Sequence, residues 1–297
     1  MLHLLLLSPL LFQNPPPPPA PKEAPAPLAR PDTTPLVPGA IPEGTSAEAR
    51  ARWQQFRMAA LAPKATATPI VAFDLVLDAR IRQAENQSNE NMTPLRYRFQ
   101  KPDWVRATTE HGYELIHGQK GDFLIDPKRG GTQPLAVGRE GAEDRKQLGE
   151  ISDLSRNFLA LTDPSALRIA EMRCGSADPA LPPTAQALDW LEILTPDFRT
   201  PGSAPTGMLR VQLGLNRDRH LPELCLVGPG EPGARPATLI RVKDYREKQG
   251  LVVPCNLALF PLEKATGKFP EKPPLELWLK NDSDLRPQFP PETFEPR

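Results

Sequence analysis

The sequence predicts a mainly β domain, with one antiparallel sheet of about 9–11 strands and two helices lying on one side of it. Apolar residues recur at every second position in most segments of the chain. Glycines separate many of these segments, as in strands joined by tight turns. Proline accounts for 39 of the 297 residues, and proline breaks helix interiors, so a long helical bundle is excluded.

The first predicted element is a short amphipathic helix over Glu48–Leu61. Ser46 places a hydroxyl just before an acidic first turn, which is a helix start signal. Trp53, Phe56 and Ala60 follow at helical spacing and predict one buried side.

Strands with one buried face are predicted next, because the hydrophobic period changes from helical to two. The residues expected to line the buried face are Phe73, Leu75, Leu77, Leu95, Tyr97, Phe99 and Trp104. Further strand-like segments are residues 104–109, 112–117, 122–125, 167–172, 188–194, 208–215, 224–227, 238–243, 251–260 and 274–279.

One internal helix interrupts this series at Glu143–Thr162. Leu154, Phe158 and Leu161 recur there at three- and four-residue steps, which is typical of a helix with one apolar face. We expect this helix to lie on the sheet.

The N-terminus differs from the domain in composition. Residues 1–12 form an apolar run of signal-peptide length, too short for a membrane span of about 20 residues. A misassigned start codon is the alternative origin of this run. Residues 13–44 are rich in proline and predict a disordered, extended linker. Residues 45–297 are expected to form a single domain, which is free and soluble after export if the apolar run is a signal peptide.

Charge and cysteine content exclude or leave open some further classes. The chain has 36 basic and 36 acidic residues, whereas a nucleic-acid-binding protein normally has a basic excess. The three cysteines, Cys174, Cys225 and Cys255, show no CxxC spacing. Cys225 and Cys255 could pair, but we favour three buried thiols that act as small hydrophobic side chains.

The motifs that would indicate an enzyme or a metal site are weak. The segment 228–233 matches GxGxxG, but no helical pattern follows it, so it predicts a surface turn. His111 and His117 lack further ligands at a supporting spacing, and no serine lies in a GxSxG motif. We therefore expect no catalytic residue, no metal, no cofactor and no enzymatic activity.

Several segments resemble the LolA-like family of periplasmic outer-membrane lipoprotein carrier proteins. The resemblance spans roughly residues 67–296. The long loops at 130–145, 174–185 and 195–206 and the proline tract depart from the family pattern. The segments that carry the resemblance are Phe73–Leu75, Tyr97–Arg106, Glu114–Gly118, Phe123–Pro127, Leu239–Tyr245, Gly250–Pro254, Leu275–Asn281 and Phe289–Pro291.

The resemblance implies an open, incomplete antiparallel β-barrel with a helical lid. It also implies reversible binding of lipoprotein acyl chains or other lipid in an apolar cavity, and transport through the periplasm. The implied partners are an inner-membrane release complex and an outer-membrane acceptor. Arg96, Arg98 and Arg106 are candidates for contacts at the entrance or lid, although a solvated strand face explains them equally well. The alternative function is an exported structural or protein-interaction module with a filled interior.

Overall fold

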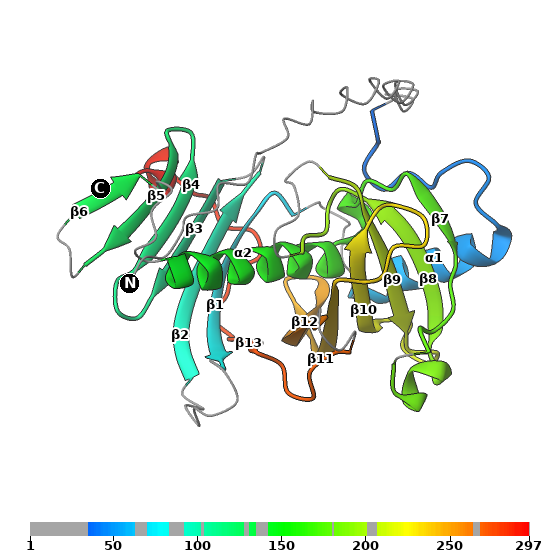
Figure 1. Ribbon diagram of the computed structural model, residues 1–297. Coiled ribbons are helices and arrows are strands. Elements are labelled where there is room, and N and C mark those ends of the chain that lie inside the picture. Colours follow the sequence, from blue (N-terminus) through cyan, green and yellow to red (C-terminus); the bar gives the residue numbers. More distant parts are fainter. Residues whose placement is uncertain are drawn as a thin grey trace, which may run out of the picture. The chain divides into compact units, whose positions relative to one another are not determined.

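The computed structural model (Figure 1) describes residues 35–62, 70–82, 92–101, 104–127, 131–134, 142–179, 181–200, 207–263 and 268–296. The helices in this part of the chain are α1 (Ala47–Ala59) and α2 (Ala142–Thr162), with 3-10 turns η1 (Pro164–Ala166), η2 (Pro183–Ala187) and η3 (Pro291–Phe294). The strands are β1 (Ala72–Ile81), β2 (Met92–Gln100), β3 (Trp104–Thr109), β4 (Glu114–Gly118), β5 (Gly121–Asp126), β6 (Gly131–Pro134), β7 (Glu171–Cys174), β8 (Asp189–Thr195), β9 (Leu209–Leu215), β10 (Pro222–Pro229), β11 (Thr238–Lys248), β12 (Leu251–Pro261) and β13 (Leu275–Leu279).

All of these strands belong to one antiparallel sheet in the order β6-β5-β4-β3-β2-β1-β13-β12-β11-β10-β9-β8-β7. The two end strands, β6 and β7, do not pair with each other, so the predicted open sheet is confirmed. The described residues contain 13 strands, more than the about 9–11 expected from alternation. The difference has a physical reason, because a four-residue edge strand such as β6 is too short to show a period of two.

Alternation along the strands gives the sheet two different faces. The inner face carries apolar side chains from the strands, and these join the residues of both helices in one hydrophobic core. Directly opposed residues in β1 and β2, such as Leu75 and Tyr97, point to this inner face together. The outer face carries most of the charged side chains, among them Asp74, Arg98 and Glu276.

The two helices cover the inner face, as the sequence predicts. α1 begins at Ser46, whose hydroxyl accepts a hydrogen bond from the Ala49 amide at 3.2 Å. It packs on β7 and β8 through buried residues that include Trp53 and Phe56. α2 runs across the strands rather than along them (Figure 1) and contacts β3 and β12.

The compact unit that contains the sheet begins at Leu36, earlier than the boundary at residue 45 expected from composition. The Gly39 amide donates a hydrogen bond to the Leu167 carbonyl at 2.8 Å, and Ile41 packs against the core. These contacts attach residues that composition places in the linker. The expected signal peptide and residues 13–34 lie outside the described residues. No helix among the described residues has the length and apolar character needed to cross a membrane.

Candidate functional site

Six of the seven residues expected to line an apolar site lie together on the inner face. β1 and β2 place them as three directly opposed pairs: Phe73 with Phe99, Leu75 with Tyr97, and Leu77 with Leu95. All six are at most 4% exposed. The Phe73 ring stacks on both Tyr97 and Phe99, with ring centroids 5.9 Å and 5.0 Å apart.

Trp104 does not join this set. In the β2–β3 register, Val105 lies opposite Phe99 and shares its face, so the neighbouring Trp104 points to the outer face. Its ring lies 5.9 Å from that of Phe294 in η3. Its partial burial therefore comes from the C-terminal segment rather than from α2.

α2 fills most of the space over the six residues. The Phe158 ring meets Phe73 at 6.3 Å, edge to face, and Leu154 and Leu161 are fully buried beside it. The gap left between α2 and the sheet is about 10 Å³ and is bordered by Leu77, among other residues. A single water needs about 10–15 Å³, so this gap holds no acyl chain while α2 stays in place.

α2 carries several buried or half-buried polar groups. Tyr97 and Ser152 share a hydrogen bond between their hydroxyls at 3.0 Å. The hydroxyls of Ser155 and Thr162 are buried without a hydrogen-bond partner in the described part of the chain. Burial also raises the pKa of Asp153 to about 6, an effect that the nearby arginines Arg156 and Arg199 partly oppose. An unsatisfied buried polar group costs about 1–3 kcal/mol, so the Ser155 and Thr162 hydroxyls weaken the packing of α2.

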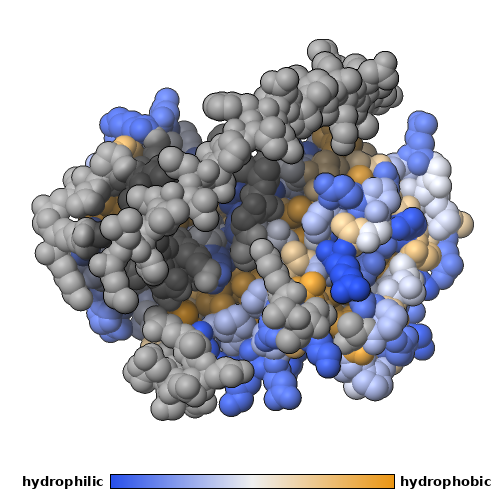
Figure 2. Space-filling view, in the orientation of Figure 1, coloured by the Kyte–Doolittle hydropathy of each residue, from blue (hydrophilic) through white to orange (hydrophobic). Residues whose placement is uncertain are grey.

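A larger cleft of about 760 Å³ opens beside the C-terminal half of α2. Figure 2, which views the α2 side of the sheet, shows hydrophobic residues reaching the surface among hydrophilic ones. The apolar wall of the cleft includes Phe99, one of the six predicted residues. The lining residues are Pro38, Phe99, Lys101, Arg156, Leu159, Ala160, Asp163, Ala166, Leu167, Arg168, Pro196, Asp197 and Arg199.

Four basic residues and two carboxylates line this α2 cleft, and a third carboxylate, Asp153, lies near Arg156 and Arg199. Arg168 donates to Asp197 at 2.6 Å, and Asp163 accepts a hydrogen bond from the Ile70 amide at 3.0 Å. Both carboxylates thus have partners within the chain. The cleft therefore combines apolar walls with a basic rim, a combination that suits an amphiphile with an anionic head.

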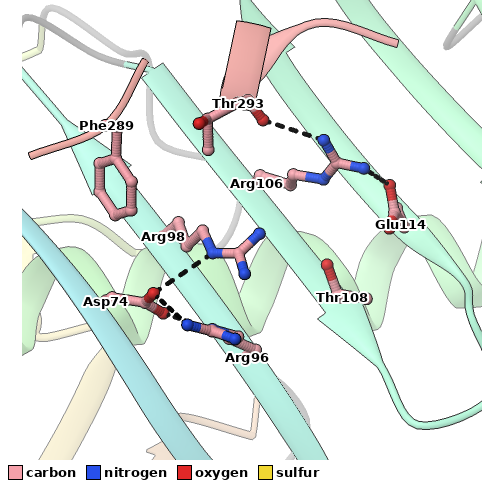
Figure 3. Close-up of a pocket in the computed structure, with 8 residues that line it drawn as sticks. All are labelled: Asp74, Arg96, Arg98, Arg106, Thr108, Glu114, Phe289 and Thr293. Atoms are coloured by element: carbon pink, nitrogen blue, oxygen red, sulfur yellow. Dashed lines mark hydrogen bonds and ion pairs between the residues drawn. The ribbon is translucent and has the colours of Figure 1, made fainter. Parts of the chain in front are cut away.

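Arg96, Arg98 and Arg106 lie on the outer face of the sheet, which agrees with the strand-face alternative and not with contacts at an entrance or lid over the inner face. They line a second cleft of about 620 Å³ (Figure 3). Sequence reasoning did not predict this outer cleft, because its carboxylates come from other strands. The lining residues are Asp74, Arg96, Arg98, Arg106, Thr108, Glu114, Phe289 and Thr293.

The remaining motifs lie in turns and in the core. The segment 228–233 begins with the last two residues of β10, Gly228 and Pro229, and continues into the connection to β11, where the sequence predicts a surface turn. All three cysteines are free; Cys225 and Cys255 are buried and Cys174 is half-buried. Burial raises the pKa of each thiol. Among the described residues, no group of three metal-ligating side chains comes together.

Comparison with known proteins finds similar structures but no similar sequence. No protein-family model matches the chain, and no curated protein matches it. A LolA superfamily protein from Nitrosomonas europaea is similar in structure, with 10% identity, a TM-score of 0.44, and coverage of 84% of this chain and 97% of that one. A putative outer membrane lipoprotein-sorting protein domain from Vibrio parahaemolyticus shows 10% identity and a TM-score of 0.45, and the match covers 84% of this chain and 96% of that domain.

A DUF1329 family protein from Desulfovibrio piger gives a comparable match, with 11% identity and a TM-score of 0.46. That match covers 83% of this chain and 97% of the other.

Proposed function

We propose that this protein binds the acyl chains of a lipoprotein or other lipid between the inner face of its sheet and α2, and carries them through the periplasm without a covalent step. The observation that carries the proposal is the α2 cleft, where a basic rim meets an apolar wall that continues into the inner face. Phe99 belongs to the cleft and stacks on Phe73, which in turn meets Phe158 under α2.

In this proposal an acyl chain enters at the cleft and displaces α2 from the sheet. The apolar burial lost when α2 leaves the sheet is comparable to the burial gained by an acyl chain in its place. Burying a large apolar side chain such as Leu154, Phe158 or Leu161 stabilises by about 1.5–3 kcal/mol. Each buried CH₂ of an acyl chain contributes about 0.8 kcal/mol, so roughly ten carbons offset the loss of all three. The unpartnered hydroxyls of Ser155 and Thr162 lower the cost of moving α2 further.

The basic rim selects the kind of lipid. Lys101, Arg168 and Arg199 lie at the same cleft as the apolar wall. An anionic head group would remain at this rim, near water, while the acyl chain moves under α2. We therefore expect lipids with a negative head to bind better than neutral lipids of the same chain length, and to do so more strongly at low ionic strength.

The test is to lock α2 onto the sheet. Ser155 and Cys255 border the same small gap, so Ser155→Cys places a second thiol beside a native one. Oxidation of this variant should form a disulfide, detected by mass spectrometry. Uptake of a fluorescent long-chain fatty acid should then be lost, and a reductant should restore it.

The wild-type protein under the same oxidant is the control for its three native thiols. Lipids extracted from the purified wild-type protein should also include acyl species when analysed by mass spectrometry. Uptake that is unaffected by the disulfide would show that lipid does not enter under α2. No uptake by any form would favour the alternative, a structural or interaction module whose interior is permanently filled.

A further inference from the structure

The outer cleft contains an arginine whose hydrogen-bonding capacity is only partly used (Figure 3). Arg98 donates from its Nε to an Asp74 oxygen at 3.3 Å. Its two terminal nitrogens, Nη1 and Nη2, have no hydrogen-bond partner in the part of the chain that the structure describes. The side chain is 25% exposed and borders the cleft. Four of the five N–H donors of this guanidinium, two on each terminal nitrogen, are therefore available to a ligand.

The two neighbouring arginines of the cleft have more hydrogen-bond partners than Arg98. Arg96 donates hydrogen bonds to both carboxylate oxygens of Asp74, at 2.7 Å and 2.6 Å. Arg106, nearly fully buried, contacts Glu114 and donates to the Thr293 carbonyl at 3.0 Å. Figure 3 shows the Arg98 guanidinium between these two groups. The contact with Asp74 is the hydrogen bond that orients Arg98 in the cleft.

The charge of the cleft indicates a ligand with one negative charge. Three guanidinium groups face two carboxylates, Asp74 and Glu114, which leaves an excess of one positive charge. A planar carboxylate matches two parallel guanidinium N–H groups in a bidentate contact. A doubly charged phosphate monoester would exceed the available positive charge and meet the two carboxylates.

The cleft is also larger than a simple ion requires. Its volume of about 620 Å³ lies within the range of about 300–1,000 Å³ typical of small-molecule sites. One wall is the ring of Phe289, which packs edge to face on Phe294 with centroids 5.4 Å apart. The hydroxyl groups of Thr108 and Thr293 border the same space. An apolar group attached to the carboxylate would have Phe289 to pack against.

We propose that the outer cleft binds a small organic carboxylate, with the carboxylate on the terminal nitrogens of Arg98 and the apolar part against Phe289. This site is on the opposite face of the sheet from the proposed lipid site. It does not depend on lipid binding.

Isothermal titration of the full-length protein at low ionic strength tests the proposal, with benzoate, acetate and inorganic phosphate as separate probes. Benzoate should bind saturably and at least tenfold more tightly than acetate or phosphate. Arg98→Gln should weaken benzoate binding at least tenfold. Phe289→Ala should weaken benzoate several-fold and leave acetate unchanged.

Arg173→Gln is the matched control, because Arg173 is an outer-face arginine that pairs with Glu192 far from the cleft. This variant should bind benzoate as the wild type does. Circular dichroism checks the fold of each variant. If Arg98→Gln does not fold, Arg98→Lys keeps the charge beside Asp74, loses the parallel donors, and should still weaken binding several-fold.

Three results would overturn the proposal. The first is no saturable benzoate binding by the wild type, and the second is equal binding by the Arg98 variants and the wild type. The third is tighter binding of phosphate than of either carboxylate, which would assign the cleft to phosphate instead.

Discussion

The two faces of one sheet in this protein are held by different forces. The inner face consists of apolar side chains packed under α1 and α2. The outer face combines a smaller apolar cluster, which includes Leu226 and Phe260, with carboxylates such as Glu192 that bind more than one arginine. Glu192, for example, takes hydrogen bonds from Arg173, Arg210 and Gln212. The same strands supply both faces, so neighbouring residues of one strand should respond very differently to the same substitution.

The largest expected effect separates Leu77 from Val76. Leu77→Asp places a carboxyl in the core, where Leu77 is 3% exposed, and should lower the free energy of unfolding by about 3–5 kcal/mol. Val76 faces the outer side, with Arg96 as its register partner. Val76→Asp should therefore cost less than about 1 kcal/mol, since an exposed ion pair forms there. Urea denaturation measures the free energy of unfolding of both variants. Equal losses of stability would contradict the assignment of Leu77 to the inner face and Val76 to the outer face.

Leu77→Asp should also abolish fatty-acid uptake wherever the variant remains folded, whereas Val76→Asp should bind as the wild type does. Uptake is measured at a temperature at which circular dichroism shows both variants to be native. Retained uptake by a folded Leu77→Asp protein would remove the inner face from the proposed lipid path.

Asp153 tests the α2 side through its pH dependence. Burial raises its pKa to about 6, above the ordinary value of 3.8. The folded state therefore binds this proton more readily than the unfolded state, and stability should increase as pH falls from about 6 towards 4. Asp153→Asn should add about 2 kcal/mol at pH 7 and remove this increase. Denaturation midpoints of the wild type and the variant, measured from pH 7 to pH 4, test this prediction. If the variant keeps the pH profile of the wild type, Asp153 is not the group that causes it.

Glu192 should show the opposite pH dependence on the outer face. Burial alone would raise its pKa, but Arg210, Gln212 and Arg173 together hold the pKa below the ordinary value of 4.5. The stability that this carboxylate contributes is present above pH 4.5 and decreases as pH falls below it. Glu192→Gln should lower the free energy of unfolding by about 1.5 kcal/mol at pH 7. A loss that persists undiminished in acid would argue against a charged network.

The smallest expected effect distinguishes two serines of α2. Ser155→Ala removes a buried hydroxyl without a described partner and should stabilise the protein by about 1 kcal/mol. Ser152→Ala removes the hydroxyl that bonds to Tyr97 and should destabilise it by about the same amount. Thermal denaturation of the pair measures the difference, and the same sign for both would contradict the described packing.

The sequence alone could predict the open sheet, both helices and the face of six inner residues. Period-two alternation places Leu75 and Tyr97 on a buried side, and helical spacing places Phe158 on the sheet side of α2. Trp104 is the exception among the seven predicted residues. Its true phase follows from the β2–β3 register, in which Val105, not Trp104, shares a face with Phe99.

The sequence could not predict how full the inner face is. The small gap depends on Phe158 meeting Phe73, residues far apart in the chain whose distance is set only by tertiary packing. The outer cleft could not be predicted from the sequence for the same reason. Its arginines lie on β2 and β3, but the carboxylates that leave Arg98 partly free, Asp74 and Glu114, come from β1 and β4.

The position of β13 has a consequence for how the chain folds. This strand, the last of the sheet in sequence, lies between β1 and β12 and joins the early and late groups of strands. The early group, β1 to β6, cannot complete its pairing until residues 275–279 have been synthesised. Such non-local pairing slows folding. Nascent chains will therefore expose the unpaired edge of β1 for most of synthesis, a period in which a chaperone that shields strand edges would limit aggregation.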